Sequence, residues 1–378
     1  MSPVAPGRAA LRQARIDLDA LRSNVRIIRE LVAPARLLVV VKAEGYGHGA
    51  ELVARAALEA GADRLGVADI PEALALRAAG IEAPILAWLH GPDADFAAAL
   101  DAGIDVGVST IEQIRELARL GAARSSPAQI QVKLDTGLSR NGVDLADWPT
   151  VAAELAELVT ARALRVTGVF SHLSNTSLED DAAKLVSFET ALEVADSAGL
   201  DVGLRHIAAS EAAITRPESR YDQVRVGITM YGLPPDARVD VAALGLRPVM
   251  ELSASIIAVR QVPAGAGVSY GFTHRTERPT TLALIPLGYA DGVPRSASGR
   301  GAEVFINGRR YPIVGRIAMD QLVVDLGDAS AQIGDRAVLW GDPATGVPSA
   351  EDWARWAGTI GYEIVTRVGP RVPRVAVG

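Results

Sequence analysis

The segment LLVVVKAEGYGHG, residues 37–49, decides the fold. It begins with a short apolar run of the kind that forms a buried parallel strand, and it ends in a glycine-rich turn. A helical pattern follows directly at Ala50–Ala60. Strand, turn and helix in this order predict the first unit of an α/β fold built on a parallel sheet.

The same alternation repeats along the first 240 residues, with helical patterns such as Pro71–Ala79, Thr110–Leu120 and Asp181–Ala198 between the apolar runs. Eight units of this kind predict a (β/α)8 TIM-type barrel. An open doubly wound sheet is the alternative, but no G-x-G-x-x-G turn follows the first strand. The expected strands are Leu37–Val41, Arg64–Val67, Pro84–Trp88, Asp105–Val108, Gln129–Leu134, Leu164–Phe170, Leu204–Ile207 and Gln223–Val226.

Local signals mark where several of these helices begin and end. Pro71 suits a first helical turn, and Ser109 is expected to cap the helix that starts at Thr110. Glycines follow four helices, where a left-handed residue is favoured. These glycines are Gly61, Gly80, Gly103 and Gly121.

The pattern changes after residue 240. Short β-like segments are broken there by Pro, Gly and an Asn307-Gly308 turn. We therefore expect a barrel domain at residues 1–240 and a mostly β C-terminal domain at 241–378, on which the first residues of the chain can pack. The expected β segments are Glu251–Val259, Thr281–Pro286, Ala302–Ile306, Arg310–Val314 and Gln321–Leu326.

Composition excludes several classes of function. The chain has no cysteine, so disulfides, thiolate catalysis and Cys-based metal sites are excluded, and no metal site is expected. A net charge of −7 disfavours a nucleic-acid partner. No apolar stretch is long enough to span a membrane, and Met1 to Leu11 lack the apolar core of a secretory signal. These features predict a cytoplasmic globular enzyme.

Lysine is scarce, because arginine carries nearly all of the positive charge and only Lys42, Lys133 and Lys184 remain. An arginine cannot form a Schiff base at neutral pH, whereas a lysine can. Lys42 directly follows the first strand, on the face where barrel active sites form, and desolvation there would free its amine. The alternative is a surface lysine in a glycine-rich loop.

The run from Lys42 to Gly49 resembles the pyridoxal-phosphate lysine motif of alanine racemases, and the resemblance extends over nearly the whole chain. It implies that Lys42 holds pyridoxal 5'-phosphate as an internal aldimine and that Tyr46 meets the phosphate. The family usually has Asp or Asn and then Ala where Glu44 and Gly45 stand here.

Later strand ends carry further matches to the family. The segment 133–142 resembles the one whose arginine, here Arg140, contacts the cofactor and the substrate carboxylate. In several members the lysine at the Lys133 position is carbamylated; the alternative is an ordinary ion pair inside the barrel. His172 matches the histidine that stacks near the cofactor and supports an arginine, and Ser210 matches a phosphate-binding serine, or else a helix cap. Ala209 replaces the usual Asn.

The segment 222–232 is the most diagnostic one. The resemblance places Arg225 opposite the pyridine nitrogen and the backbone of Gly227 and Ile228 against the phosphate. Because a guanidinium only donates, it would leave the ring nitrogen unprotonated. A structural salt bridge is the alternative for Arg225. Ser177 stands where the family often has an Asp at the entrance channel.

The C-terminal half supplies the remaining candidates. By resemblance Tyr270 is the second catalytic base, Tyr289 and Arg295 lie near the substrate entrance, the backbone of Met319 meets the substrate carboxylate, and Tyr362 reaches the phosphate. The matching segments are 267–271, 285–295, 315–321, 361–364 and 371–374.

The resemblance implies interconversion of L-alanine and D-alanine, which supplies D-alanine for peptidoglycan. Inversion needs a base on each face of the substrate, and these are Lys42 for the D-enantiomer and Tyr270 for the L-enantiomer. It also implies a homodimer with shared active sites. Three alternatives remain: a broader racemase that acts on serine, a barrel-type amino-acid decarboxylase, and a non-catalytic pyridoxal-phosphate carrier. Arg225 and the absence of cysteine disfavour the decarboxylase, and the β domain with Tyr270 disfavours the carrier.

Overall fold

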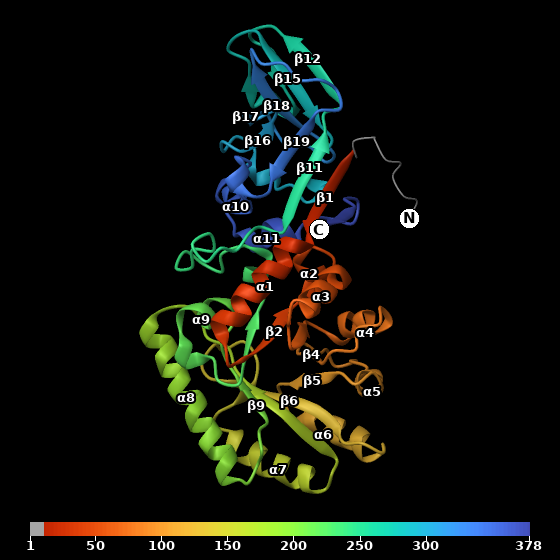
Figure 1. Ribbon diagram of the computed structural model, residues 1–378, viewed down its shortest axis with the longest axis vertical. Coiled ribbons are helices and arrows are strands. Elements are labelled where there is room, and N and C mark those ends of the chain that lie inside the picture. Colours follow the sequence, from red (N-terminus) through yellow and green to blue (C-terminus); the bar gives the residue numbers. More distant parts are fainter. Residues whose placement is uncertain (1–10) are drawn as a thin grey trace.

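The computed structural model describes residues 11–378 and shows two stacked bodies, a helix-covered barrel and a β-rich domain (Figure 1). Helix α1 (Leu18–Val32) lies where they meet. The expectation about a secretory signal concerns residues 1–10, which lie outside the described residues. The division of the chain at residue 240 stays a prediction.

The first body is the predicted (β/α)8 barrel. Its parallel ladder runs β10-β2-β3-β4-β5-β6-β8-β9, with short β7 (Val143–Asp144) beside β6. Between β9 and β10 the barrel is closed by two backbone hydrogen bonds, from Arg225 N–H to Ala208 O (3.0 Å) and from Asp222 N–H to Arg205 O (3.1 Å). The barrel strands are β2 (Arg36–Val40), β3 (Arg64–Val67), β4 (Ile85–Ala87), β5 (Asp105–Val108), β6 (Ala128–Asp135), β8 (Leu164–Phe170), β9 (Leu204–His206) and β10 (Gln223–Val226).

The expected helices are present, and two of the local signals were wrong. Thr110, not Ser109, caps α6: its side chain accepts from the N–H of Gln113, three residues into the helix. Gly121 lies inside α6, where an added Cβ would stand 2.1 Å from Ala163 O, so it serves close packing. The barrel helices are α2 (Lys42–Tyr46), α3 (Ala50–Glu59), α4 (Ile70–Ala78), α5 (Phe96–Asp101), α6 (Ile111–Ala122), α7 (Trp148–Thr160), α8 (Leu178–Ser197) and α9 (Ser210–Thr215).

The second body is built on one sheet in the order β12-β15-β18-β17-β16-β19-β11-β1-β20. Strand β1 comes from the start of the chain and pairs with β11 and β20. The strands are β1 (Arg12–Asp17), β11 (Met250–Ser255), β12 (Ala258–Val262), β15 (Thr280–Ile285), β16 (Glu303–Ile306), β17 (Arg309–Val314), β18 (Leu322–Gly327), β19 (Arg336–Trp340) and β20 (Arg374–Val377), with a separate hairpin of β13 (Gly267–Val268) and β14 (His274–Arg275).

The single strand expected at Glu251–Val259 was wrong, because the chain changes partners there. Up to Ser255 it pairs with β1 and β19, whereas from Ala258 it pairs with β15. Two short helices, α10 (Ala350–Ala357) and α11 (Gly361–Thr366), complete the body, and α11 lies at the junction with the barrel (Figure 1). Short 3-10 turns occur at Pro217–Ser219, Ile228–Tyr231, Tyr270–Phe272, Tyr289–Asp291, Arg295–Ala297 and Pro343–Thr345.

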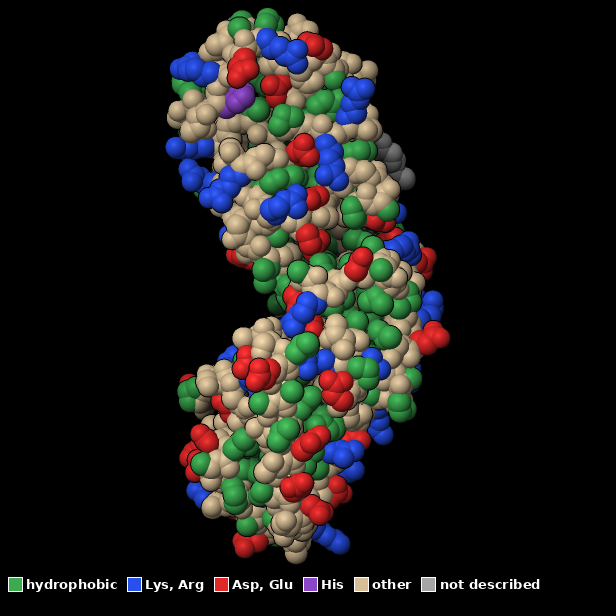
Figure 2. All heavy atoms as spheres, turned by 90° about the vertical axis from the view of Figure 1, so that its left-hand side faces the viewer, with side chains coloured by type: hydrophobic (Ala, Val, Ile, Leu, Met, Phe, Trp, Pro, Cys, Tyr) green, Lys and Arg blue, Asp and Glu red, His purple; other side chains and the backbone are tan. Residues whose placement is uncertain are grey.

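A continuous apolar core runs from the barrel into the β domain, so the two bodies are packed on each other rather than joined by a linker. In the space-filling view the outline is hollowed between them (Figure 2). Across residues 11–378, no helix has the length and apolar character that crossing a membrane requires.

Candidate active site

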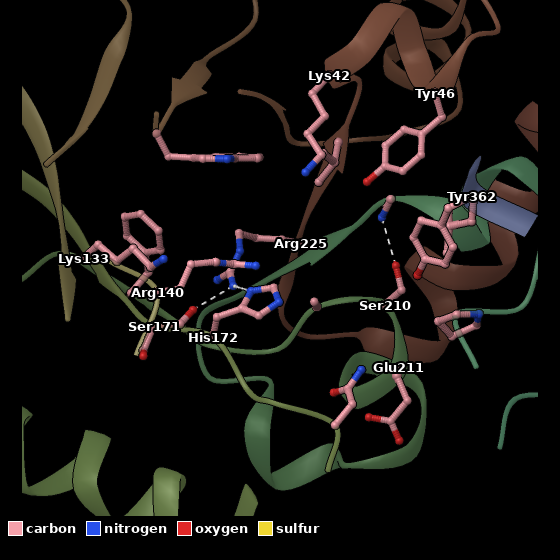
Figure 3. Close-up of a pocket in the computed structure, with 18 residues that line it drawn as sticks. Lys42, Tyr46, Lys133, Arg140, Ser171, His172, Ser210, Glu211, Arg225 and Tyr362 are labelled. Atoms are coloured by element: carbon pink, nitrogen blue, oxygen red, sulfur yellow. Dashed lines mark hydrogen bonds between the residues drawn. The ribbon is translucent and has the colours of Figure 1, made fainter. Parts of the chain in front are cut away.

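Lys42 follows the first barrel strand, β2, and begins a turn of unusual backbone geometry. Ala43, Glu44 and Tyr46 all have positive φ values, between 51° and 56°. Left-handed backbone at residues other than glycine is costly and tends to persist where function requires it. Glu72 holds the turn by accepting from the N–H of Ala43 (2.7 Å). The sharp turn leaves the Lys42 side chain pointing into a cavity (Figure 3).

That cavity lies at the carboxyl ends of the barrel strands and brings together ten of the residues expected from the sequence. They come from five barrel strand ends or the turns after them, and from α11. They are Lys42, Tyr46, Lys133, Arg140, His172, Ser210, Arg225, Gly227, Ile228 and Tyr362. In Figure 3 hydroxyl groups gather on one side of the cavity and cationic and imidazole groups on the other.

The hydroxyl side is formed by Tyr46, Ser210 and Tyr362. Ser210 accepts a hydrogen bond from Gly227 N–H (3.0 Å), and its hydroxyl hydrogen remains available to donate. Ser210 is the first residue of α9 rather than its side-chain cap. Burial raises the pKa of Tyr46 and of Tyr362, so both phenols stay protonated donors. An added Cβ on Gly227 would stand 2.3 Å from the Tyr46 hydroxyl, so only glycine fits.

Arg225 lies buried below the cavity. It donates to Nδ1 of His206 (2.9 Å), to Nδ1 of His172 (3.1 Å) and to the carbonyl of Ser171 (2.7 Å). Burial, then the charge of Arg140, lowers the pKa of Arg225 to about 9, which still leaves a cation at neutral pH. Within residues 11–378 it forms no salt bridge, so its partners are neutral acceptors rather than a carboxylate. The ring of His172 stays neutral, because burial and then Arg225 hold its pKa well below the usual value.

Two lysines face this cationic side. Burial, and next the charge of Arg140, lowers the pKa of Lys42, which favours its neutral amine; Glu72 opposes this shift. For Lys133, burial and then Arg140 lower the pKa to about 8. The ammonium of Lys133 donates to the side-chain oxygen of Asn141, so its recorded partner is an amide rather than the carboxylate of an ion pair.

Four of the expected β-domain residues lie outside the cavity, and one of them, Arg295, lines a separate hollow. Tyr270, Tyr289 and Met319 belong to the β domain and are 72%, 43% and 52% exposed. None of them lines the cavity of its own chain. Ser177 also lies elsewhere: it caps α8 by accepting from Asp180 N–H (3.0 Å).

Sequence reasoning assigned no role to three residues that stand behind Arg225. His206 accepts from Arg225, Gln131 contacts His206, and Asp105 contacts Gln131. They come from three different strands, and no local pattern distinguishes them from core positions. The part of the chain that the structure describes contains no group of three or more His, Cys, Asp or Glu side chains arranged to hold a metal ion.

The two bodies match two family models in sequence order. Residues 16–235 match the model described as alanine racemase, N-terminal domain, and residues 249–376 match alanine racemase, C-terminal domain. With the barrel and its lysine-bearing cavity, these matches define the class as an amino-acid racemase of the barrel type. The chain belongs to the alanine racemase family.

Relatives and solved structures agree with this assignment along the whole chain. An alanine racemase of Thermobifida fusca is 51% identical over 98% of this chain and 99% of its own length, and one of Mycobacterium tuberculosis is 45% identical over 99% and 98%. The crystal structure of an alanine racemase from Streptomyces lavendulae covers 100% of this chain and 98% of its own, with a TM-score of 0.95 at 46% identity.

Proposed function

We propose that this chain interconverts L-alanine and D-alanine with pyridoxal 5'-phosphate as its cofactor. The observation that carries the proposal is that Lys42 and Arg225 face one cavity whose opposite side is a cluster of hydroxyl donors. A cytoplasmic location, the absence of a nucleic-acid partner and the use of D-alanine in peptidoglycan stay predictions of the sequence.

The donor set fits the proposed cofactor. A phosphate needs uncharged or cationic hydrogen-bond donors, and Tyr46, Ser210 and Tyr362 supply three hydroxyls on one side of the cavity. Gly227 keeps the backbone close to them. An amine attacks a carbonyl carbon only in its neutral form, and burial favours this form of Lys42. When bound, pyridoxal phosphate would supply the aldehyde that condenses with amines and the conjugated ring that acidifies the α-hydrogen.

The remaining residues would bind and move protons. Lys42 would accept or return the α-proton on one face of the substrate. Arg225 offers only N–H donors, so a ring nitrogen opposite it would stay unprotonated. Arg140 would hold the substrate carboxylate. A Lys133 pKa of about 8 leaves about a tenth of the amine neutral at pH 7, which is the form that carbamylation requires.

The base for the other face would come from a second copy of the chain. Tyr270, Tyr289 and Met319 are exposed on the β domain, away from the cavity of their own chain. A two-fold dimer would bring Tyr270 of each chain to the cavity of its partner and would form two equivalent sites. In this dimer the partner chain would also cover the exposed apolar side chains of Phe272 and Met319.

Two measurements test the function. Purified protein incubated with a panel of L-amino acids should form D-alanine fastest, whereas faster formation of D-serine would identify a broader racemase and release of carbon dioxide a decarboxylase. Borohydride reduction followed by peptide mapping should place the pyridoxyl group on Lys42. The peptides that carry Lys133 and Lys184 are internal controls, and labelling on either, or no bound cofactor, would contradict the proposal.

A further inference from the structure

A chain of buried polar side chains runs down the barrel interior from Arg225. Nε2 of His206 lies 2.8 Å from Oε1 of Gln131, and Nε2 of Gln131 donates to Asp105 (3.1 Å). Asp105 is in turn paired with Arg64. His206 and Gln131 are fully buried, and Asp105 is 7% exposed. We call Arg225, His206, Gln131, Asp105 and Arg64 the axial column.

The column joins two cavities. Its upper end, Arg225, lines the candidate active site. Its lower end, Asp105 and Arg64, lines a second cavity at the amino-terminal ends of the barrel strands, together with the arginines 36, 77 and 165. Barrel interiors are usually filled with branched apolar side chains, so a continuous polar path between the two ends needs a reason.

The donors and acceptors along the column agree on one direction for its hydrogen bonds. Arg225 can only donate, so Nδ1 of His206 must accept. A neutral His206 then carries its hydrogen on Nε2 and donates it to Gln131 Oε1. Burial, then the charge of Arg225, holds the pKa of His206 well below its usual value and so keeps the ring neutral. At the lower end the Asp105 carboxylate can only accept, so the amide of Gln131 must turn its NH2 group toward Asp105 and its oxygen toward His206.

The surrounding packing is shaped for the column. The ring of Phe170 stacks on His206 with an interplanar angle of 5° and centroids 5.0 Å apart, which sets the plane of the imidazole. An added Cβ on Gly168 would lie 2.9 Å from the carbonyl oxygen of Leu204 and 3.0 Å from Oε1 of Gln131, so glycine leaves room for both. The single hydroxyl of Thr167 is shared between Asp105 (3.2 Å) and the carbonyl of Ile130 (3.1 Å).

We propose that Gln131 and Asp105 are positioning residues that fix the tautomer of His206 and thereby the direction in which Arg225 presents its remaining N–H donors to the active-site cavity. A neutral histidine without a fixed partner at Nε2 can exchange between its two tautomers. In the Nδ1–H tautomer the N–H of His206 would face an N–H of Arg225, and the two donors would push the guanidinium away. The catalytic part of this proposal rests on the proposed function, whereas the tautomer part does not.

The first test reads the tautomer directly. Long-range 1H–15N NMR spectra of the full-length protein labelled with 15N-histidine distinguish Nε2–H from Nδ1–H rings, and His206→Gln assigns the signal among the five histidines. Wild type should show His206 as the neutral Nε2–H form. Gln131→Met, which keeps the volume but removes the amide, should give mixed tautomers or a ring that titrates. An unchanged Nε2–H signal in Gln131→Met would overturn the proposal.

The second test uses Gln131→Glu as a conditional rescue. A protonated carboxyl can accept from His206 and donate to Asp105 as the amide does, but an ionised one cannot. The groups that face this position are Asp105 from β5, Arg64 from β3, His206 from β9 and Arg225 from β10. The nearest, Asp105, opposes a second negative charge. The ratio of kcat to that of wild type should therefore be near one at low pH and fall about tenfold at high pH.

Two comparisons separate positioning from mere support of the fold. Gln131→Met should lower kcat about tenfold at every pH with little change in the KM for alanine. Thr167→Val removes a further donor to Asp105 and leaves the contacts of Asp105 with Gln131 and Arg64 in place, so the His206 tautomer and kcat should match wild type. A flat pH ratio in Gln131→Glu, or equal losses in Thr167→Val and Gln131→Met, would overturn the proposal. If wild type shows no racemisation, the NMR result still decides the tautomer part.

Discussion

The candidate residues of the barrel cavity are mostly buried, whereas those of the β domain are exposed. In the cavity Arg225 is 6% exposed and holds hydrogen bonds to Ser171, His172 and His206. On the β domain Tyr270 is 72% exposed. A group that transfers a proton has to be held within a fraction of an ångström of its target. The cavity holds its residues within one chain, and in the proposed dimer Tyr270 would be held against the partner chain.

The difference predicts complementation between two inactive variants. Lys42→Ala and Tyr270→Phe, each inactive alone, are co-expressed with different tags. In a heterodimer one site carries both lesions and the other carries neither. Tag-purified heterodimers should therefore recover about half of wild-type activity, and random pairing about a quarter.

Inactive heterodimers would contradict the proposal that each site is shared between two chains. If each site were built within one chain, every site would carry one lesion and no activity would return. Light scattering must show that the purified heterodimer is a folded dimer, so that a loss of assembly is not read as a result on the site. The matched homodimers of each variant set the background.

Arg225→Glu tests how strongly the buried half of the site depends on its donors. The substitution removes the N–H groups that His172 and His206 accept from, and it places a negative charge where the cavity now has a positive one. Racemisation should fall on the order of a hundredfold. A new long-wavelength absorption band should appear with alanine, together with more transamination. An unchanged spectrum and rate would place Arg225 away from the ring nitrogen.

The barrel could be predicted because each unit carries its own signal. A short apolar run followed by a helical pattern is local, and strands Arg64–Val67 and Asp105–Val108 occur with the predicted bounds. Nine of the ten cavity residues could be named because they stand beside barrel strand ends in recognisable segments, and Tyr362 because its own segment on α11 is recognisable. Their roles stay predictions, since only their positions are observed.

The parts that escaped prediction depend on contacts distant in sequence. The run Glu251–Val259 contains no Pro or Gly, so no turn residue in it marks the change of sheet partner after Ser255. The axial column joins His206 to Gln131, 75 residues away, and Gln131 to Asp105, 26 residues away. Such pairs meet only once the barrel closes, and a buried glutamine alone reads as an ordinary core position.

Gly227→Ala sharpens the account of the hydroxyl side. The added methyl would overlap the Tyr46 hydroxyl, which stands 2.3 Å from the ideal Cβ position, so Tyr46 must shift. Overpacking of this kind costs about 1–3 kcal/mol. We expect the affinity for pyridoxal phosphate, measured by fluorescence titration of the cofactor-free protein, to fall at least tenfold. Gly91→Ala is the matched control, because no atom lies within 4 Å of its added Cβ. Equal affinities in the two variants would show that the hydroxyl side does not hold the phosphate.

The smallest expected effect is a loss of folding stability at acidic pH that comes from His48. Nδ1 of His48 donates to the carbonyls of Gly45 (3.0 Å) and Tyr46 (2.9 Å), while its Nε2 is buried without a partner. Burial lowers the pKa of His48 to about 4, against about 6.5 in an unfolded chain. Below pH 6.5 the unfolded state therefore binds a proton that the folded state does not. Stability from this group is full above pH 6.5 and is lost as the pH falls toward 4. At pH 5.5 the loss is about 1 kcal/mol.

Hydrogen exchange can locate this loss. Opening free energies of peptides from α2 and α3 should fall by about 1 kcal/mol more in wild type than in His48→Asn between pH 7.5 and 5.5, after correction for intrinsic rates. Peptides from β16 to β18 of the β domain lie far from His48 and serve as the internal reference. They should show the same change in both proteins, because the proton is excluded at the active-site turn and not across the whole molecule. An equal fall in wild type and variant at α2 and α3 would mean that His48 is already protonated in the folded state, and that the turn after Lys42 tolerates a charge beneath it.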